Sequence, residues 1–537
     1  MKHKSPALPF ILGAVFLAAF IPAAYFGFQA LQPPVRISAE LSQAAPLSAL
    51  AEVKTRRPSR ISLQIQGRDD NDLQVDFPET SHHHQIPILG LYPDHQNRVK
   101  FRITTDQGQV FERSLTLTTQ ALPADYPDIR VERQQPDKIA PGLIYLHLGH
   151  YDAEGNFTSF PSAIDEYGRV RWLYTGKIGH VFKRLENGNF LIHRKGDEDG
   201  RARGETAGSP DNDHLLEIDP LGRRVALRGE VQTGIHHDAV PMPNGNILTL
   251  TSALGSYDDG VVEIAGDSGE VLRGWDLRNI LQPERPPQPR NLEKGDWLHL
   301  NGIDYNPADD SFILSGRDQS AVVKVQRESG RLKWILGNHE HWSEPFRQYL
   351  LQPNPGPGNT AQRSSTAQDN SRQGSSFEWQ WGQHAPMFHP DNPRRLLVYD
   401  NGNRRSYDKP LPATKNYSRA VEYEVDPSSM EVRQIWEFGR RYGSELYTPF
   451  IGDADYLSNG NRLVCFGGIT RSLEGEAIEI FDFKNDSINP MKVEARIIEV
   501  TPEQPAQEVL NITIADPDPD SHRGYRSYRA IKMPLYP

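Results

Sequence analysis

The sequence predicts an all-β protein: a six-bladed β-propeller preceded by a small β-sandwich and an apolar N-terminal segment. Short runs of alternating apolar and polar residues fill residues 58–120, which is typical of half-buried strands. Beyond Pro141, strand-and-turn units follow one another at irregular spacing without helical periodicity. Counting the recurring ends of these units gives six, and four strands per unit are typical of a propeller blade.

The composition bounds the class of protein. With 537 residues the chain is longer than a single hydrophobic core usually supports, so several domains or one large repeat architecture are expected. Its 37% hydrophobic residues, with Gly 43 and Pro 42, indicate a globular, turn-rich protein. A net charge of −11 without a basic domain argues against nucleic-acid binding. The single cysteine, Cys465, excludes an intrachain disulfide and is expected to be a buried core residue.

Residues 1–34 predict a membrane anchor. A basic start, Met1-Lys-His-Lys4, precedes an uncharged stretch from Leu8 to Phe28. This stretch is long enough for a membrane-spanning helix, whereas the apolar region of a signal peptide usually has about 7–15 residues. The basic end would stay in the cytoplasm and the rest of the chain would lie in the periplasm, tethered to the inner membrane. The alternative is a cleaved signal that leaves a soluble periplasmic protein.

Residues 35–135 are expected to form the small β-sandwich, because four alternating segments lie between turn residues there. The triplet His82-His83-His84 is a poor metal site, since consecutive residues of a strand point to opposite faces.

Residues 140–537 carry the repeat. His180 and His237 each stand seven residues before an Asn-Gly-Asn turn, a strong hairpin pattern, and a third copy has Gly452 in place of histidine. Looser copies begin at His299 and His384. The segment Tyr525–Pro537 is expected to pair beside 143–146 and close the ring, which avoids a bare sheet edge.

The propeller prediction brings these histidines together. The first strand of each blade is innermost, so four histidines at the starts of first strands should face one axial funnel. Arg317 follows a second strand and should point into the same mouth. Imidazoles and a guanidinium suit an oxyanion better than a divalent metal, which an arginine would repel. Alternatively, each histidine only hydrogen-bonds the neighbouring blade. His236 is expected to point away from the channel.

Five motifs in this order resemble the bacterial arylsulfate sulfotransferases: His237-Asp-Ala-Val-Pro-Met-Pro-Asn-Gly-Asn, Asp296-Trp-Leu-His-Leu-Asn-Gly-Ile-Asp-Tyr305, Ser315-Gly-Arg317, Gly382-Gln-His-Ala-Pro386, and Ser418-Arg-Ala420 with Gln434-Ile-Trp-Glu437. The resemblance implies a cofactor-free, PAPS-independent enzyme that moves a sulfuryl group from an aryl sulfate donor to a phenolic acceptor with ping-pong kinetics. It also implies a homodimer.

The same resemblance assigns the site. His384 would be the nucleophile and form a sulfohistidine, with His299, Asn301 and Arg317 holding the sulfuryl oxygens. His237 would transfer the proton. His180 and Arg419 would contribute to substrate binding.

The sequence departs from the family at residues 352–383, which contain no cysteine, whereas well-known members have a disulfide just before the nucleophile. This polar insert is interpreted as a lid or acceptor loop, or as a plain solvated insert. Two other functions stay open: a metal-dependent, lactonase-like propeller hydrolase, and a non-catalytic envelope propeller that binds a ligand or partner.

Overall fold

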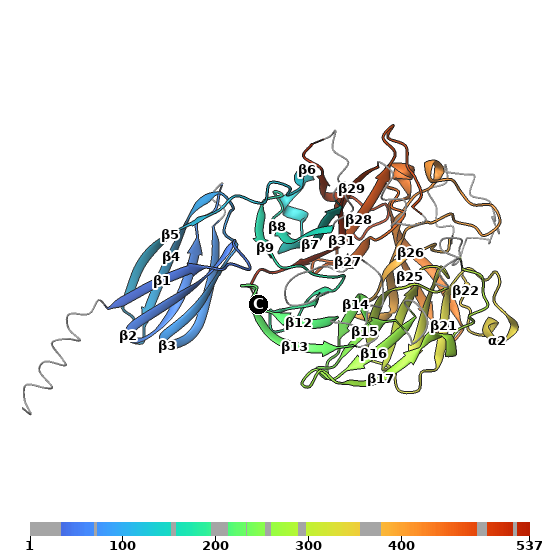
Figure 1. Ribbon diagram of the computed structural model, residues 1–537, viewed down its shortest axis with the longest axis horizontal. Coiled ribbons are helices and arrows are strands. Elements are labelled where there is room, and N and C mark those ends of the chain that lie inside the picture. Colours follow the sequence, from blue (N-terminus) through green and yellow to red (C-terminus); the bar gives the residue numbers. More distant parts are fainter. Residues whose placement is uncertain are drawn as a thin grey trace, which may run out of the picture. The chain divides into compact units, whose positions relative to one another are not determined.

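A computed structural model describes residues 34–68, 72–151, 157–194, 213–231, 234–252, 259–287, 297–354, 377–480, 491–518 and 524–536 (Figure 1). The predicted anchor therefore lies outside the described residues, apart from residue 34. Within these ranges no helix combines the length and apolar character needed to cross a bilayer. The chain divides into two compact units. Unit 1 holds Ala49–Ile88, Gln96–Thr118 and the described residues up to Leu41; unit 2 holds Ser42–Ser48, Leu89–His95 and Thr119–Pro537.

Unit 1 is a five-stranded antiparallel sheet, with strands β1 (Val35–Leu41), β2 (Ser48–Ile65), β3 (Leu73–Leu89), β4 (His95–Thr105) and β5 (Val110–Thr119). Hydrogen bonds join all five strands through β2, which pairs with β1 along its first half and with β4 along its second. The predicted alternation is confirmed in β4, where buried residues alternate with Arg98, Lys100 and Arg102. Of the histidine triplet, His84 is buried and His83 is exposed beside Glu52, as expected for opposite faces.

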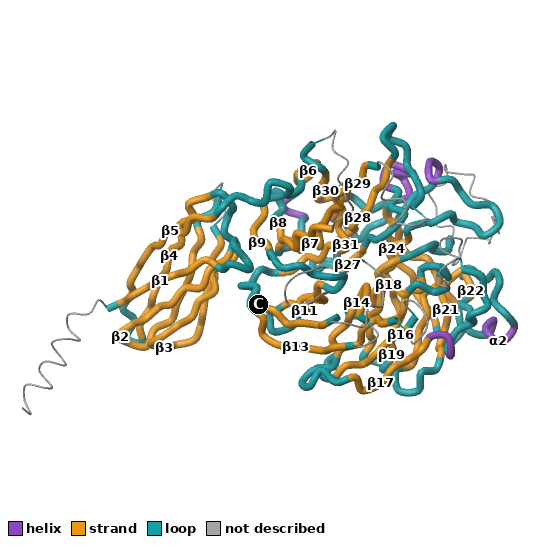
Figure 2. Tube along the Cα trace, viewed as in Figure 1, coloured by secondary structure: helices purple, strands orange, loops and turns teal. Residues whose placement is uncertain are grey.

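Unit 2 is dominated by strands, and its described part contains six antiparallel sheets (Figure 2). Three sheets have four strands that follow one another in the sequence: β10 (Phe182–Arg184), β11 (Phe190–Arg194), β12 (His214–Ile218) and β13 (Arg224–Glu230); β14 (Ile235–Pro241), β15 (Ile247–Thr251), β16 (Gly260–Ile264) and β17 (Val271–Asp276); and β18 (Leu300–Asn306), β19 (Ser311–Gly316), β20 (Ala321–Gln326) and β21 (Leu332–Gly337). The fourth sheet contains β23 (His384–His389), β24 (Asn392–Asp400), β25 (Arg419–Asp426) and β26 (Glu431–Phe438), and the short β22 (Gln352–Pro353) pairs parallel to β26. The last two sheets combine distant segments: β27 (Asp453–Tyr456), β28 (Arg462–Arg471), β29 (Lys492–Val500), β30 (Glu508–Ala515) and β6 (Asp128–Gln134); and β31 (Gly524–Met533), β7 (Leu143–Tyr151), β8 (Phe157–Ile164) and β9 (Val170–Leu173).

Helical structure in the described residues is limited to α2 (Glu344–Arg347) and four 3-10 turns, η1 (Pro136–Lys138), η2 (Leu277–Asn279), η4 (Ala413–Lys415) and η5 (Arg440–Leu446). The three Asn-Gly-Asn segments form the predicted hairpin turns. In each turn the first asparagine accepts a hydrogen bond from the backbone N–H two residues later, and the glycine has a positive φ, which glycine adopts without strain.

Edge strands of successive sheets pack against one another: β14 against β18, β18 against β23, β23 against β27, and β27 against β31. Two sheets of unit 2 combine strands that are distant in the sequence. The C-terminal β31 pairs with β7, which confirms the predicted closing strand. β6 pairs with β30, so part of the predicted 35–135 domain belongs to unit 2.

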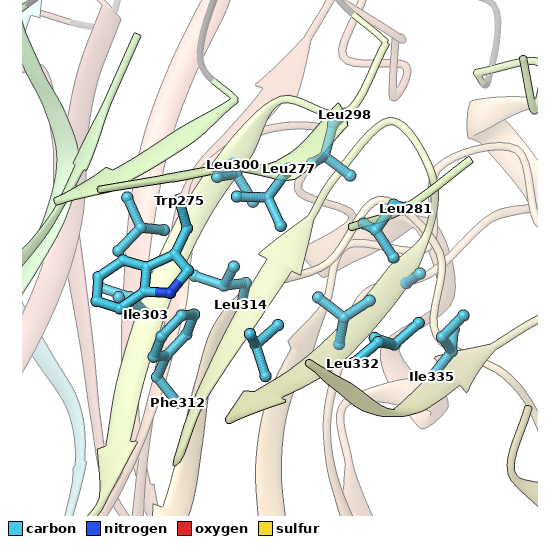
Figure 3. Packing of buried hydrophobic residues seen from close by; sticks show 14 of the residues in the cluster. Trp275, Leu277, Leu281, Leu298, Leu300, Ile303, Phe312, Leu314, Leu332 and Ile335 are labelled. Carbon is cyan, nitrogen blue, oxygen red and sulfur yellow. The ribbon is translucent and has the colours of Figure 1, made fainter. Parts of the chain in front are cut away.

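The cores lie between neighbouring sheets. In the largest cluster, Leu248 and Trp275 pack with Leu300, Phe312 and the residues around them, which joins the β14–β17 sheet to the β18–β21 sheet (Figure 3). Burying each such side chain contributes roughly 1.5–3 kcal/mol relative to exposure. The cysteine prediction is confirmed, because Cys465 is fully buried in β28.

Candidate functional site

Four predicted histidines lie at or near the starts of strands at the edges of four successive sheets. His384 is the first residue of β23 and His237 lies in β14, whereas His180 and His299 stand just before β10 and β18. Three of these strands carry a β-bulge at this level: the pairing register shifts after His236 in β14, after Leu300 in β18 and after His384 in β23. A bulge interrupts the alternation of a strand and can redirect a side chain.

The rings of three histidines from three sheets lie in contact. The centroids of His180 and His237 are 4.7 Å apart and stacked, and those of His237 and His299 are 4.9 Å apart and edge-to-face. The backbone N–H of His237 donates to His180 Nδ1 at 3.3 Å. Both His237 and His299 have a positive φ of 52°, which is uncommon for residues other than glycine. Such backbone conformations cluster at functional sites.

The electrostatics of His237 reflect this crowding. Burial is the largest cause that lowers its pKa well below the usual value, and the imidazoles of His180, His299, His236 and His384 lower it further. His237 is therefore neutral at neutral pH in the absence of an anion. A bound anion would act in the opposite direction, because a nearby negative charge favours the protonated ring.

His384 is almost completely buried, and hydrogen bonds hold both its imidazole ring and the backbone that precedes it. Its Nδ1 lies 2.7 Å from Asn401 Oδ1. The carbonyl of the preceding residue, Gln383, accepts hydrogen bonds from Asn301 Nδ2 at 2.9 Å and from Ser315 Oγ at 3.0 Å. The backbone before the imidazole is thus fixed by two residues of the neighbouring β18–β21 sheet.

Two further predicted residues belong to this layer. Asn301 is fully buried, and its Oδ1 has no hydrogen-bond partner among the described residues. Arg317 is also buried; its Nη1 pairs with Asp318 at 3.3 Å and its Nη2 donates to the Pro449 carbonyl at 2.9 Å. The backbone N–H of Arg317 donates to the His299 carbonyl at 3.2 Å, which ties the arginine to the histidine layer. Within the described residues Arg317 Nε has no acceptor.

Arg419 lies in a different setting. Its Nε donates to Asp400 at 2.8 Å, its Nη1 contacts Glu437, and its Nη2 donates to the Glu378 carbonyl at 3.0 Å. Burial alone would raise the pKa of the Glu378 carboxyl, but Arg405, Arg419 and Arg440 outweigh it, and with Tyr417 they lower the pKa to about 2. These contacts do not support the prediction that Arg419 binds substrate. They make it part of a buried ion network that anchors the segment leading to His384.

The prediction for His236 was wrong. Its Nδ1 lies 2.9 Å from His237 Nδ1, so it adjoins the site instead of pointing away. The bulge at this point of β14 breaks the strand alternation on which the prediction relied.

Sequence reasoning also missed two residues of β31, where a bulge falls between Ser527 and Ala530. The Tyr528 ring lies 5.0 Å from the His180 ring. The next residue, Arg529, pairs with Asp238 at 2.8 Å and with Asp453 at 3.2 Å. Tyr528 could have been found by extending the repeat alignment into the closing strand.

The carboxylate of Asp238, the residue after His237, is the centre of a buried polar network next to the histidines. Besides Arg529 it pairs with Lys183 of β10 at 3.1 Å and accepts the Ile303 N–H of β18 at 3.2 Å. Because Arg529 also reaches Asp453 of β27, this network joins five of the described sheets of unit 2.

The arrangement defines a class of protein: an all-β protein built of successive antiparallel sheets, whose edge strands bring several imidazoles into contact in a buried polar layer. No group of three or more His, Cys, Asp or Glu side chains among the described residues is placed to hold a metal ion. The sequence matches the arylsulfotransferase (ASST) family over residues 128–526, and the Ig-like domain of arylsulfotransferases over residues 38–120. The chain therefore belongs to the arylsulfotransferase family and is an aryl sulfotransferase enzyme.

Two relatives are similar over most of their length. Arylsulfate sulfotransferase AssT of Escherichia coli O6:H1 (strain CFT073) is 25% identical, with 86% of this chain and 89% of the relative covered. Arylsulfate sulfotransferase AssT of Lelliottia amnigena is also 25% identical, with 89% and 93% covered.

Solved structures resemble the chain more distantly. A putative 6-phosphogluconolactonase from Bacteroides uniformis has a TM-score of 0.36 and 10% identity, with 69% of this chain and 82% of that chain covered. The periplasmic gluconolactonase PpgL of Pseudomonas aeruginosa has a TM-score of 0.31 and 12% identity, with 89% and 97% covered. At this level the likeness carries no conclusion about fold or activity.

Proposed function

We propose that this protein transfers a sulfuryl group from an aryl sulfate ester to a phenolic acceptor through a sulfohistidine at His384. The observation that carries the proposal is the contact of the His180, His237 and His299 rings, with the His384 imidazole near enough to lower the pKa of His237 and the Arg317 backbone bonded to His299. Such a set of side chains favours a sulfate ester over a neutral ligand, because imidazoles and a guanidinium supply hydrogen-bond donors to its oxygens.

In the first half-reaction, a ring nitrogen of His384 forms a bond to sulfur while the bond between sulfur and the phenolic oxygen breaks. The phenolate leaves with the electron pair of that bond. Arg317 and His299 bind the sulfuryl oxygens, and Asn301 holds the Gln383 carbonyl beside them. The bound anion raises the pKa of His237, so this ring takes up a proton and gives it to the departing oxygen.

The second half-reaction runs in reverse with the acceptor. Its phenolic proton passes to His237, its oxygen attacks sulfur, and the bond between nitrogen and sulfur breaks, which restores neutral His384. The first product leaves before the acceptor binds, so the kinetics are ping-pong. His180 acts through its contact with His237. Arg419 acts at a distance, through the ion network around Glu378.

We further propose that the six sheets of unit 2 are the blades of a six-bladed β-propeller, closed by β31. The sequential packing of their edge strands supports this arrangement. The apolar segment 8–28 supports a periplasmic location with attachment to the inner membrane. The homodimer rests on family resemblance alone, and sedimentation equilibrium tests it.

The test is incubation with p-nitrophenyl sulfate, first without and then with phenol. Without acceptor, we expect a burst of nitrophenol that matches the enzyme concentration, and a mass increase of one sulfuryl group on His384. With phenol, turnover should become continuous. His384→Ala should abolish both the burst and the adduct, whereas the matched control His82→Ala, at an exposed histidine of unit 1, should keep them.

The same assay separates the other two functions. A metal-dependent hydrolase loses its activity on chelation and forms no adduct. A non-catalytic binding protein gives neither nitrophenol nor adduct. If the wild-type protein releases no nitrophenol, or if the adduct lies on another residue, the proposed reaction is refuted for this donor.

A further inference from the structure

We infer that Asn401 is a positioning residue for His384, which it holds in the tautomer that carries its proton on Nδ1 and its lone pair on Nε2. This inference rests on the proposed function, because it identifies which nitrogen of His384 attacks sulfur. Asn401 follows the last residue of β24, the strand that pairs with β23, and it is fully buried.

The orientation of the Asn401 amide follows from its neighbours. Its Nδ2 lies 2.9 Å from the Thr448 carbonyl oxygen and 2.7 Å from the Ile451 carbonyl oxygen. Both neighbours can only accept a hydrogen bond, so the NH₂ group must face them. The opposite orientation would place an amide oxygen against two carbonyl oxygens in a buried site, which costs free energy.

That orientation decides the tautomer of His384. With the NH₂ group turned to the two carbonyls, Oδ1 faces His384 Nδ1 at 2.7 Å. An amide oxygen only accepts, so the hydrogen of a neutral His384 must lie on Nδ1. Nε2 then carries the lone pair that a nucleophile requires.

Asn401 is itself rigidly held. Its carbonyl accepts a hydrogen bond from Ser418 Oγ at 2.7 Å, and Ser418 Oγ also accepts from the Thr448 N–H at 2.9 Å. On the other side, the Asp400 carboxylate accepts from the Trp381 N–H at 2.9 Å. The part of the chain that carries Asn401 is therefore fixed both to the segment that precedes His384 and to the segment that follows β26.

An amide next to His384 Nδ1, in place of a carboxylate, keeps the sulfuryl group on His384 easy to transfer. Sulfurylation of Nε2 gives the ring a positive charge, and its Nδ1–H then donates more strongly to Asn401 Oδ1. A carboxylate at this place would neutralise that charge and stabilise the intermediate. It would also raise the pKa of the resting His384 and so favour a protonated ring without a lone pair. A neutral acceptor orients the ring and leaves the bond between nitrogen and sulfur reactive.

The first test needs no turnover. In protein labelled with ¹⁵N-histidine, the His384 signals are assigned by their disappearance in His384→Gln. At a pH where the ring is neutral, we expect a protonated Nδ1 and an unprotonated Nε2 in the wild type, and a mixture of tautomers in Asn401→Ala. A wild-type spectrum with the proton on Nε2 overturns the inference, whether or not the protein transfers sulfuryl groups.

The second test links the tautomer to chemistry. The rate of the nitrophenol burst should fall by up to about 100-fold in Asn401→Ala, because small misplacements of a reacting group have effects of this size. The control is Thr448→Val, which removes the hydroxyl that donates to the Leu446 carbonyl at 3.1 Å in the same segment but keeps the Thr448 carbonyl that Asn401 binds, and it should reduce the rate less than threefold. Equal losses in both variants would show that Asn401 only anchors the segment. If the wild type gives no burst but the expected tautomer, the proposed function fails and the positioning role stands.

Discussion

At the scale of single residues, Arg317 is a buried arginine whose backbone N–H donates to the carbonyl of His299, and we propose that its guanidinium binds the sulfuryl oxygens. We expect Arg317→Lys to lower kcat for p-nitrophenyl sulfate by about 10²–10³, the usual effect of removing one donor that stabilises developing charge. Lysine keeps the charge but not the planar fork of N–H groups that matches sulfuryl oxygens. Steady-state kinetics measure this effect.

The control for this prediction is Arg394→Lys, because Arg394 is an exposed arginine that pairs with Asp426 outside the site. This variant should keep the wild-type rate. Full activity in Arg317→Lys would show that only the positive charge matters and that the hydrogen-bond geometry does not.

Repetition explains which site residues could be predicted from the sequence. His180 and His237 are recognisable because each precedes the same hairpin turn by the same spacing. Asn401 has no such pattern. It reaches His384 because β23 and β24 pair with His384 opposite Tyr399, and this register is a property of the folded hairpin. The contacts of Arg419 also depend on segments distant in the sequence, so a motif around this residue could not predict them.

At the scale of elements, the close approach of β18 and β23 positions His384. Gly302 of β18 permits this approach: an added Cβ would lie 2.7 Å from Pro386 Cδ and 3.1 Å from the Ala385 backbone nitrogen. We expect Gly302→Ala to cost about 1–3 kcal/mol of stability, because backbone must move. The start of β23 should shift with it and lower kcat by about 100-fold, since misplacements near 1 Å have such effects.

Gly274→Ala is the matched control, because a Cβ at this position of β17 would meet its nearest atoms at an ordinary 3.5 Å. Thermal unfolding and the nitrophenol burst should both stay close to wild type. A Gly302→Ala variant with normal burst kinetics would mean that the spacing of these two strands does not determine the position of His384.

The bulges mark the limit of pattern reasoning at this scale. Alternation predicted strands and hairpins correctly, but it assumed an unbroken two-residue period. The register shifts in β14, β18 and β23 occur where the histidines lie. A bulge there depends on contacts between sheets, which a single sequence does not display. The sequence therefore predicted at which end of the strands the histidines lie, but not the direction in which every side chain points.

At the scale of unit 2, buried polar contacts join edge strands of different sheets, in addition to the apolar cores. Asp238 and Arg529 come from strands nearly 300 residues apart in the chain, separated by 291 positions. The pairing of β31 with β7 could be predicted, because a lone strand after the last repeat needs a partner. The charged layer could not, because buried aspartates look the same in sequence as exposed ones.

This buried polar interior makes the stability of unit 2 depend on pH. His147 of β7 is buried, and burial first, followed by Arg526 and Arg529, lowers its pKa from 6.5 to about 3. Below pH 6.5 the unfolded chain binds a proton at this histidine that the folded protein does not bind. The free energy of unfolding therefore decreases as the pH is lowered, and His147 alone accounts for about 2 kcal/mol of this decrease between pH 6.5 and 5.

Asp304 works in the opposite direction, because burial raises its pKa from 3.8 to about 6. Its folded form binds a proton that the unfolded form releases, so its contribution is present at low pH and is lost as pH rises through 6. The wild-type profile thus contains partly cancelling contributions. The contribution of His147 must be measured as a difference between two proteins.

The comparison is wild type against His147→Phe, which keeps an aromatic ring beside Phe182 and Tyr528 and removes the titrating group. All tryptophans of the chain lie in unit 2, so their fluorescence during urea unfolding reports on this unit. Between pH 7 and 5, the variant should lose about 2 kcal/mol less stability than the wild type, and above pH 7 the two curves should run parallel. Parallel curves down to pH 5 would mean that His147 takes up its proton in the folded protein and that the interior beneath the site is open to water.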